Sequence, residues 1–540
     1  MKTYIQSKFI LILLLFFVVF YNSMLAQDIQ IEWQKTIGAD HNDYFWDMEI
    51  TSDGGFILGG TSFSNMSGDK TEDLIGIMDY WVVKLDSFGD IEWENTIGGN
   101  LIDQLQIVKQ TVDGGYILGG SSDSGVSGDK TESSPNGNLA YWIVKLNSSG
   151  SIEWQNTIGG SGNDRFYSLQ QTTDGGYIIG GYSDSDISGD KTENSQGSND
   201  YWVVKLDSFG VIEWQNTIGG DVDDELYYIS QTQDGGYILG GSSDSSVSGD
   251  KTEASTGGIY DHDYWIVKLN SSGTIEWQNT IGGDRADRVY NVIQIADGGY
   301  IVSGVSVSGI SGDKTETNFG NFDYWIVKLD TNGAVIWENT IGGGLNENVH
   351  FTEEESDGFI LGGFSESNMS PDKSEDSKGG ADFWIIKLDT SGNIVWENTI
   401  GGSDFDQCKS IHKMFDGGYI AAGTSNSDIS GDKTENSNGL RDFWLMKLYE
   451  SPLSIQEFDL EDKISLYPNP SNSTSTIDFD IIYPNISLEL LDVLGKSVYR
   501  KKYENTDSIE LNIESLAPGI YFIRLEVKNS LANLKLVKNS

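Results

Sequence analysis

Apolar and polar positions along most of this chain follow one pattern that repeats about every sixty residues. In residues 226–283 it predicts four short strands, at 226–232, 237–241, 264–269 and 275–281. The first two are joined by Asp234-Gly235, a pair that favours a tight hairpin because both residues tolerate positive φ. A long polar loop separates the second strand from the third. Since no window shows the apolar spacing of a helix, each unit reads as four antiparallel strands.

Three markers occur seven times each and set the number of units. An Asp-Gly-Gly turn recurs in six units and is Asp357-Gly358-Phe359 in the other. Repeats of this length favour β-propeller blades over a β-solenoid, whose coils are usually much shorter. The second marker is the tryptophan that ends Ile-Glu-Trp or a variant of it: Trp33, Trp93, Trp154, Trp214, Trp277, Trp337 and Trp396. The third is the tryptophan that ends an aromatic pair: Trp81, Trp142, Trp202, Trp265, Trp325, Trp384 and Trp444.

The two ends of the repeat region complement each other. A lone fourth strand, 31–37, precedes the first complete unit, and the last unit stops after its third strand, 443–448. We expect the N-terminal strand to complete the last blade, because this leaves no open edge between the first and last blades. The expected fold is all-β: a seven-bladed β-propeller over residues 27–450, closed by its N-terminal strand.

The N-terminus has the pattern of a signal peptide. Lys2 and Lys8 form a basic segment, and residues 9–20 are an unbroken apolar run, too short to favour a membrane span. We expect residues 1–26 to be removed between Ala26 and Gln27; a membrane anchor is the alternative. No other stretch is apolar enough to span a bilayer, so the mature chain should have no membrane-spanning segment.

Charge separates the C-terminal region from the repeats. The chain is acidic, with a formal net charge of −48, but the region from Lys463 onward contains nine basic and nine acidic residues. Residues 451–462 therefore read as a linker, and residues 463–540 as a second domain, a small β-sandwich (Ig-like) of about seven short strands. The acidity argues against nucleic-acid binding, since a polyanion needs cations to neutralise its phosphates. Cys408 is the only cysteine, which excludes an internal disulfide.

The units resemble the bacterial β-propeller repeat family over about residues 28–450. The resemblance rests on Ile158-Gly159-Gly160, Asp164, Asp174-Gly175-Gly176, Gly180, Asp200-Tyr201-Trp202 and Lys205-Leu206 through Gly210. The third and fourth strands also resemble quinoprotein repeats, as in Lys268 through Gly273 followed by Trp277, but the adjacent cysteine pair of many quinoproteins is absent. Both resemblances imply a propeller and neither implies a substrate.

The tail resembles the C-terminal sorting domain of the type IX secretion system, type A (Por). The residues that carry the resemblance are Pro468, Asn469, Pro470, Gly495, Lys496, Gly519, Tyr521, Lys535 and Lys538. It implies export across the outer membrane of a bacterium of the Bacteroidota kind, with the type IX machinery as partner. The implied location is secreted or on the outer cell surface. An ordinary sandwich module is the alternative.

Two repeated groups of oxygen ligands raise the question of calcium. The connection into each first strand places one carboxylate at a fixed offset: Asp43, Asp103, Asp164, Asp224, Asp287, Glu347 and Asp406. These seven could bind a cation near the channel mouth, or cap backbone amides in every blade. The long loop carries Ser-Gly-Asp-Lys-Thr-Glu, as at residues 127–132, which offers calcium oxygens but has a lysine at its centre. Calcium is thus the one cofactor left open, and blade construction the competing explanation.

A catalytic site on a propeller should break the sevenfold repeat, and few residues do so. They are His41, Trp46, Arg165, His262, Arg285, Arg288, His350, Cys408 and His412. They show no Ser-His-Asp order, no paired-His metal motif and no phosphate-binding glycine loop, so no catalytic residue is assigned. Cys408 is expected to be a buried apolar residue.

The function expected from these observations is a non-catalytic binding or adhesion module, with glycans or surface proteins as candidate partners. A secreted lyase or hydrolase acting on the long-loop face is the alternative, favoured if the arginines and histidines cluster in one pocket. A structural surface-layer protein is a third option, which self-association would reveal.

Overall fold

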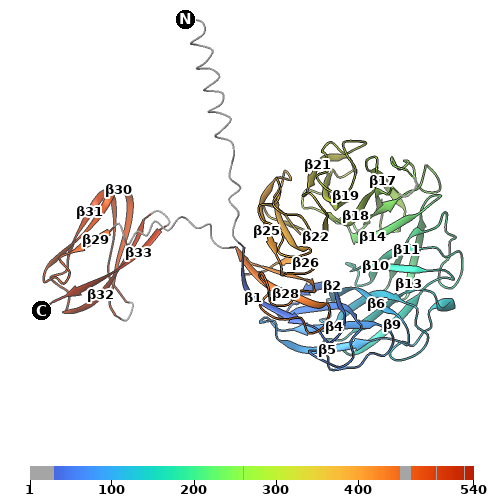
Figure 1. The fold of residues 1–540 in the computed structure, drawn as a ribbon, viewed down its shortest axis with the longest axis horizontal. Coiled ribbons are helices and arrows are strands. Elements are labelled where there is room, and N and C mark those ends of the chain that lie inside the picture. Colours follow the sequence, from blue (N-terminus) through green and yellow to red (C-terminus); the bar gives the residue numbers. More distant parts are fainter. Residues whose placement is uncertain (1–28, 259–260, 451–463, 494–495, 528–529, 540) are drawn as a thin grey trace, which may run out of the picture. The chain divides into compact units, whose positions relative to one another are not determined.

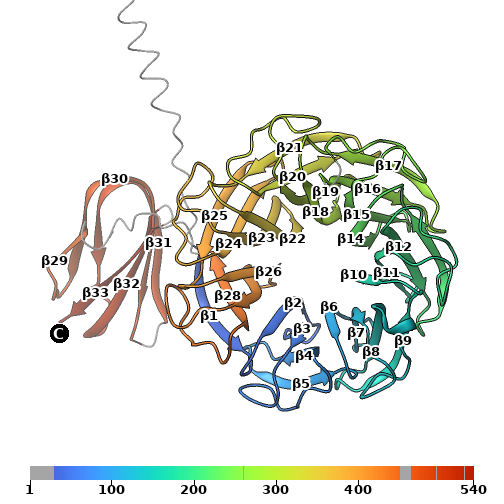
Figure 2. The ribbon, with the colours of Figure 1, turned by 45° about the vertical axis from the view of Figure 1, so that its right-hand side comes forward.

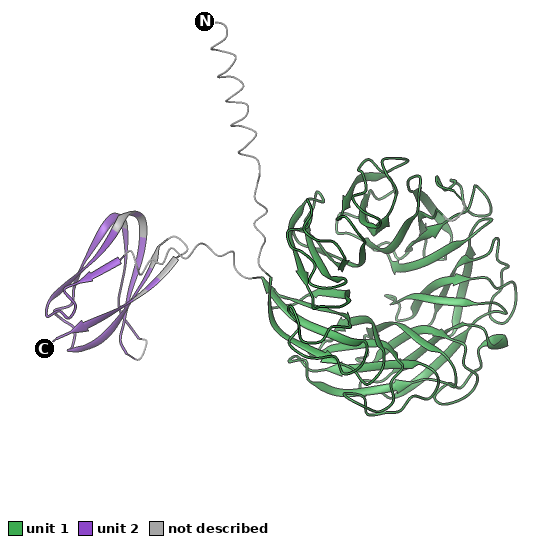
Figure 3. Ribbon diagram, in the orientation of Figure 1, with its two compact units in different colours: residues 1–450 green, residues 451–540 purple. Residues whose placement is uncertain are grey.

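The computed structural model describes residues 29–258, 261–450, 464–493, 496–527 and 530–539. The chain divides into two compact units, Met1–Glu450 and Ser451–Ser540 (Figure 3). The predicted signal peptide, its cleavage site at Ala26 and Gln27, and the predicted linker 451–462 lie outside the described residues. No helix in the described part of the chain is long and apolar enough to cross a membrane.

Within its described residues, the first unit consists of seven four-stranded antiparallel sheets arranged in a ring (Figures 1 and 2). Six of them are continuous in sequence: β2 (Asp43–Ile50), β3 (Phe56–Ser62), β4 (Asp79–Leu85) and β5 (Ile91–Ile97); β6 (Asp103–Gln110), β7 (Tyr116–Ser122), β8 (Ala140–Leu146) and β9 (Ile152–Ile158); β10 (Asp164–Gln171), β11 (Tyr177–Ser183), β12 (Asp200–Leu206) and β13 (Ile212–Ile218); β14 (Asp224–Gln231), β15 (Tyr237–Ser243), β16 (Asp263–Leu269) and β17 (Ile275–Ile281); β18 (Asp287–Gln294), β19 (Tyr300–Ser306), β20 (Asp323–Leu329) and β21 (Val335–Ile341); β22 (Glu347–Glu355), β23 (Gly358–Ser365), β24 (Asp382–Asp389) and β25 (Ile394–Ile400). In each blade the first strand is innermost (Figure 2). A short 3-10 helix, η1 (Pro135–Gly137), lies in a long loop.

The last sheet joins both ends of the repeat region. Its strands are β26 (Asp406–Lys413), β27 (Tyr419–Ser425), β28 (Asp442–Glu450) and the N-terminal β1 (Ile29–Ile37). β1 pairs antiparallel with β28 from Ile29 opposite Glu450 to Ile37 opposite Phe443. The N-terminal strand is therefore the outer strand of the last blade, and β2 of the first blade contacts β26 and β27.

Neighbouring blades share apolar cores, because the second and third strands are buried along their whole length in the first blade and along nearly all of it in the others. Ile57 and Tyr80 of the first blade pack in one cluster with Leu105 and Val108 of the second. A Cβ atom on Gly59 would lie 2.7 Å from the Leu105 side chain, so glycine allows this close approach. The same type of cluster recurs between successive blades.

The Ser-Gly-Asp-Lys-Thr-Glu loops tie the blades together. In the second blade, Lys130 is buried, with Nζ 4.8 Å from the centre of the Trp142 ring and 2.7 Å from Thr157 Oγ1. Glu132 accepts a hydrogen bond from the Thr157 backbone N–H at 2.9 Å, and Asp129 accepts one from Gly98 N–H of the preceding blade at 3.2 Å. Lys130, the residue type that argues against calcium binding by this loop, is thus buried inside the blade.

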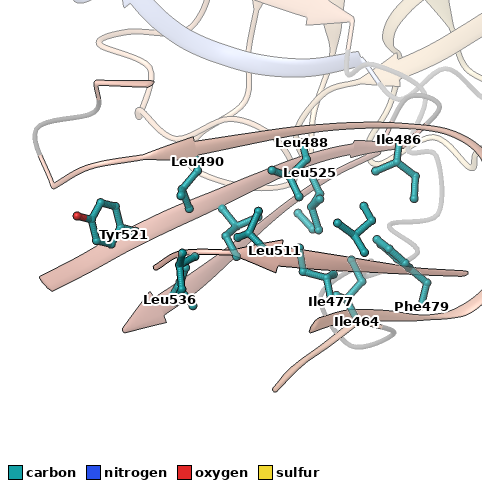
Figure 4. Close-up of a cluster of buried hydrophobic side chains, with 14 residues drawn as sticks. Ile464, Ile477, Phe479, Ile486, Leu488, Leu490, Leu511, Tyr521, Leu525 and Leu536 are labelled. Carbon is teal, nitrogen blue, oxygen red and sulfur yellow. The ribbon is translucent and has the colours of Figure 1, made fainter. Parts of the chain in front are cut away.

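The second unit is a small all-β domain. Its strands are β29 (Ile464–Tyr467), β30 (Thr474–Leu491), β31 (Ser497–Asn512), β32 (Gly519–Val527) and β33 (Ser530–Lys538). The sequence predicts seven short strands here, and the structure has five, because β30 and β31 each continue through a segment that the sequence pattern marks as a break. The register between β30 and β31 shifts between Asp478 and Tyr483. Leu488, Leu525 and Leu536 belong to one core cluster (Figure 4).

Candidate functional site: the channel wall

Each innermost strand carries a β-bulge at the same place. In β2 the register shifts between Phe45 and Asp47, which leaves Trp46 as the extra residue. A bulge re-aims the side chain of the extra residue and is often found beside functional sites. The seven extra residues, named the bulge ring from here on, are Trp46, Gln106, Tyr167, Tyr227, Tyr290, His350 and Lys409.

The bulge ring varies in sequence beside positions that are constant. The residue before each bulge is always apolar and fully buried, as Phe45, Leu105 and Cys408 illustrate. The bulge position itself holds tryptophan, glutamine, tyrosine, histidine or lysine. The fold therefore fixes the backbone at this position but does not dictate its side chain.

Two cavities meet at the bulge ring. The larger, of about 740 Å³, is lined mainly by residues that follow the bulges, including Asp47, Lys109, Tyr228 and His412. The smaller, of about 240 Å³, is lined by Gln104, Arg165 and other residues at or before the bulges. Trp46, Tyr290, His350 and Lys409 line both cavities. The smaller cavity is therefore on the side where the inner strands begin, which is the side of the long loops.

Aromatic rings form a continuous arc along one part of the ring. Ring centroids are 4.9 Å apart for Tyr167 and Tyr227, 6.2 Å for Tyr227 and Tyr290, and 5.5 Å for Tyr290 and His350. Tyr182 stacks on Tyr167 at 5.4 Å. The arc runs from β10 to β22 and gives this part of the wall flat apolar faces with polar edges.

Lys409 lies next to the end of this arc. Its Nζ is 5.2 Å from the centre of the Trp46 ring and 3.2 Å from His350 Nε2. Gln407 Nε2 lies 2.8 Å from the same nitrogen, so two donors face His350 Nε2, which then accepts and leaves the imidazole neutral. Desolvation lowers the pKa of Lys409 to about 7, and it holds the pKa of His350 well below its usual value.

Charged groups in the larger cavity are mostly paired. Lys109 Nζ lies 2.9 Å from Asp47, and His412 Nδ1 lies 2.9 Å from Glu353. By contrast, within the described residues no carboxylate forms an ion pair with Lys409 or Arg165. The two cations of the smaller cavity are thus available to a ligand.

The carboxylates singled out as metal candidates lie at the start of the inner strands and bind backbone. Asp43 accepts hydrogen bonds from the Ala39 N–H at 2.7 Å and from Ser64 Oγ at 3.2 Å. Each of the others, listed with its distance, accepts one from the glycine four residues earlier: Asp103 2.6 Å, Asp164 2.6 Å, Asp224 2.6 Å, Asp287 2.7 Å, Glu347 2.9 Å and Asp406 2.7 Å. No three His, Cys, Asp or Glu side chains within the described ranges are arranged to hold a metal ion.

Six of these carboxylates are close to a second buried carboxylate, on the third strand of the preceding blade. The pairs are Asp79 with Asp103, Asp200 with Asp224, Asp263 with Asp287, Asp323 with Glu347, Asp382 with Asp406, and Asp442 with Asp43. Desolvation, aided by the neighbouring charge, raises the pKa of Asp79 to about 6 and that of Asp263 to about 7. Ala140 stands in place of the third-strand carboxylate opposite Asp164.

The residues that break the repeat divide into two groups. Trp46, Arg165, His350 and His412 line the channel cavities. The remaining five, which line neither cavity, are His41, His262, Arg285, Arg288 and Cys408. Cys408 is fully buried, as expected, and His262 pairs with Asp244 at 2.9 Å.

Sequence reasoning found only part of this wall. Gln106, Tyr167, Tyr227, Tyr290 and Lys409 were not singled out, because each is an ordinary strand residue when its blade is read alone. The available signal was comparative: aligning the seven inner strands shows a variable position directly after a constantly apolar one.

In the tail, the proposed sorting residues gather around the last strand. Asn469 Nδ2 donates to the Lys535 carbonyl at 2.6 Å, and the Val537 N–H donates to Asn469 Oδ1 at 2.8 Å. Lys538 Nζ donates to the Asn472 carbonyl at 2.6 Å, and Tyr521 Oη to the Ala517 carbonyl at 2.9 Å. Gly495 lies outside the described residues. The loop around Pro468 and Pro470 is thereby fixed to β33.

Comparison with known families identifies the tail. Residues 465–539 match the family described as secretion system C-terminal sorting domain. The type IX sorting signal expected from the sequence is confirmed, and the protein is therefore exported and either secreted or held at the cell surface. No curated protein matches the chain.

Solved structures similar to the chain are remote. They include Sqt1 from Chaetomium thermophilum (11% identity, TM-score 0.37, 78% of this chain and 100% of that chain) and Kuenenia stuttgartiensis hydrazine synthase (11%, 0.38, 71% and 94%). Phage phi92 endosialidase is a third (11%, 0.32, 94% and 88%). At these values none of them bears on the function of this chain.

Proposed function

We propose that this exported propeller is a binding module that holds an extracellular saccharide in its central channel. The observation that carries the proposal is the bulge ring, where a backbone feature repeated in all seven blades presents different side chains. Symmetry favours a single ligand site on the axis, and variation at the ring makes that site specific.

The chemistry of the wall suits a sugar. Tyr167 and Tyr290, which line the smaller cavity, offer apolar surface for the C–H side of a ring, and Tyr227 packs against both of them. The amides of Gln104 and Gln106 provide donors and acceptors for hydroxyl groups. Two buried polar atoms of the ring, Trp46 Nε1 and Gln106 Oε1, have no hydrogen-bond partner in the described protein.

The test is a glycan array probed with the exported chain and with two variants, W46A and Y290A. We expect wild type to bind a defined set of glycans, and each variant to lose about tenfold or more in affinity because an aromatic contact is removed. The variants should keep the wild-type Tm. Absence of any glycan signal, or equal binding by both variants, would contradict the proposal.

A secreted lyase or hydrolase working in the same channel is the second candidate. It is favoured by one observation, the lysine of the bulge ring whose pKa is lowered to about 7 beside a neutral histidine, since a group titrating near the working pH is suited to proton transfer. Incubation of each array hit with the protein distinguishes the two candidates: new saccharide ends indicate an enzyme, and recovery of intact ligand indicates a binding module.

A further inference from the structure

The smaller cavity stands out against the charge of the molecule. The chain carries 82 acidic residues and 34 basic ones, yet the ten residues that line this cavity include Arg165 and Lys409 and no carboxylate. Lys409 is partly withdrawn from water, where a cation is costly unless an anion compensates it, whereas Arg165 is exposed and does not carry this cost. Both side chains are without an ion-pair partner in the described protein.

Neighbouring groups hold Lys409 in place without neutralising it. Trp46 lies under its ammonium group and attracts it through the ring face. His350 Nε2 takes one of its three N–H donors, which leaves the others free. The Lys409 ammonium group is thus held at the cavity without an anion to neutralise its charge.

From this geometry we infer that the smaller cavity is a subsite for the anionic group of an acidic sugar residue, a carboxylate or a sulfate, held between Lys409 and Arg165. The inference rests on the proposed saccharide-binding function and specifies its ligand. The neutral part of the saccharide then lies along the aromatic arc, which begins at His350, next to Lys409.

The pH at which Lys409 loses its charge depends on the groups that surround it. They are His350 on β22, Tyr290 on β18, Arg165 on β10, and Cys408 on its own strand. The larger cavity adds Asp47 and Glu49 on β2, Lys109 on β6, Glu353 and Glu354 on β22, and His412 on β26. The last six are engaged elsewhere: Asp47 by Lys109, Glu353 by His412, and Glu49 and Glu354 by backbone N–H groups of Gln110 and Ala296. Desolvation therefore dominates and lowers the pKa of Lys409.

The experiment is calorimetric titration of the exported chain with three oligosaccharides of one backbone, bearing glucose, glucuronate or a sulfated glucose at the same position. We expect an acidic form to bind at least about tenfold more tightly than the neutral form, as charge-assisted hydrogen bonds allow. Which acidic form binds better identifies the anion. In K409M the ratio of the affinity for the acidic form to that for the neutral form should fall by about tenfold or more.

Two further variants separate charge from shape. In wild type the preference for the acidic form should weaken above neutral pH, where Lys409 loses its charge. K409R should keep this preference at high pH, because arginine stays protonated. R165Q should reduce the preference without abolishing it. Equal affinity for all three ligands, or an unchanged preference in K409M, overturns the inference and leaves the proposed function standing. Binding of none of the three overturns both. The Tm of each variant, compared with wild type, shows that it is folded.

Discussion

The interfaces between blades and the wall of the channel are built from the same strands but follow opposite rules. Across the interfaces the same contacts recur: Tyr80, Tyr141, Tyr201 and Tyr264 each donate a hydrogen bond to the carbonyl of the third-strand tryptophan in the next blade, at 3.0–3.1 Å. At the bulge ring the backbone recurs in all seven blades, whereas the side chains are of five types. Repeated contacts therefore mark the scaffold, and the varied positions of the ring are where we propose that the ligand binds.

The contrast between scaffold and channel wall also separates the charged residues into two groups. The carboxylates that looked like metal ligands recur in every blade, and each bonds backbone or serine groups of its own blade. Of the two cations of the smaller cavity, Lys409 is the one lysine at its position, and Arg165 has an arginine counterpart, Arg288, in one other blade. Calcium binding by the repeated carboxylates stays a prediction.

The largest effect is expected from breaking the ring itself. Deleting residues 29–37 removes β1 and leaves the backbone of β28 unpaired along one side. We expect the protein to aggregate or to unfold without cooperativity. Size-exclusion chromatography and a thermal melt measure this; a monomer with the wild-type Tm would show that β1 is dispensable.

One tryptophan substitution on each side of the comparison should separate the two regions. Trp202 is fully buried between blades, 4.9 Å from Tyr141, and W202A should lower the free energy of unfolding by about 3–5 kcal/mol. W46A in the bulge ring should cost less than about 1 kcal/mol. Denaturant unfolding of both variants provides the measurement, and equal losses would contradict the division.

The paired carboxylates predict that the propeller is more stable in acid than at pH 8. Burial raises the pKa of Asp263 to about 7, above the unfolded value of about 3.9. Its contribution is complete below pH 4 and is lost as the pH rises to 7, because over this range the unfolded chain releases the proton while the buried carboxyl keeps it. D263N should raise the free energy of unfolding by about 2–4 kcal/mol at pH 8 and by little at pH 4.

Asp53 is the control for this pH profile. Thr51, the Gly55 N–H and Lys84 stabilise its charged form against the cost of burial, and its pKa is lowered to about 2. D53N should therefore lose stability at pH 8 and not gain it. If D263N and D53N change the free energy of unfolding at pH 8 in the same direction, the predicted sign of the carboxylate-pair effect is wrong.

The smallest effect is expected for a polar residue of the bulge ring. Gln106 Oε1 is buried without a partner, so Q106L removes an unsatisfied acceptor. We expect the free energy of unfolding to stay the same or to rise by up to about 1 kcal/mol, with weaker ligand binding. A clear loss of stability would assign Gln106 to construction.

The sequence was a good guide to the fold because blades repeat. The Asp-Gly-Gly turns, the tryptophan series and the lone strand at 31–37 each correspond to an observed element. The tail was read less well: the register shift near Tyr483 keeps β30 continuous where the sequence pattern suggests two strands.

The channel could be predicted only in part. Trp46 and His350 were visible because they depart from the repeat, whereas Tyr290 and Lys409 required knowledge of the bulge that turns them inward. A bulge is set by backbone pairing between strands and has no local sequence signature in these strands. Which polar residues face one cavity therefore became clear only from the fold.

The division of labour between interface and channel is tested most directly by replacing each bulge-ring residue in turn with alanine, and measuring Tm and saccharide affinity on the same samples. We expect Tm to stay within about 2 °C of wild type, whereas affinity should fall by about tenfold for the aromatic and cationic members. Variants that unfold, or that bind as wild type does, would show that the ring is part of the scaffold and that the ligand site lies elsewhere.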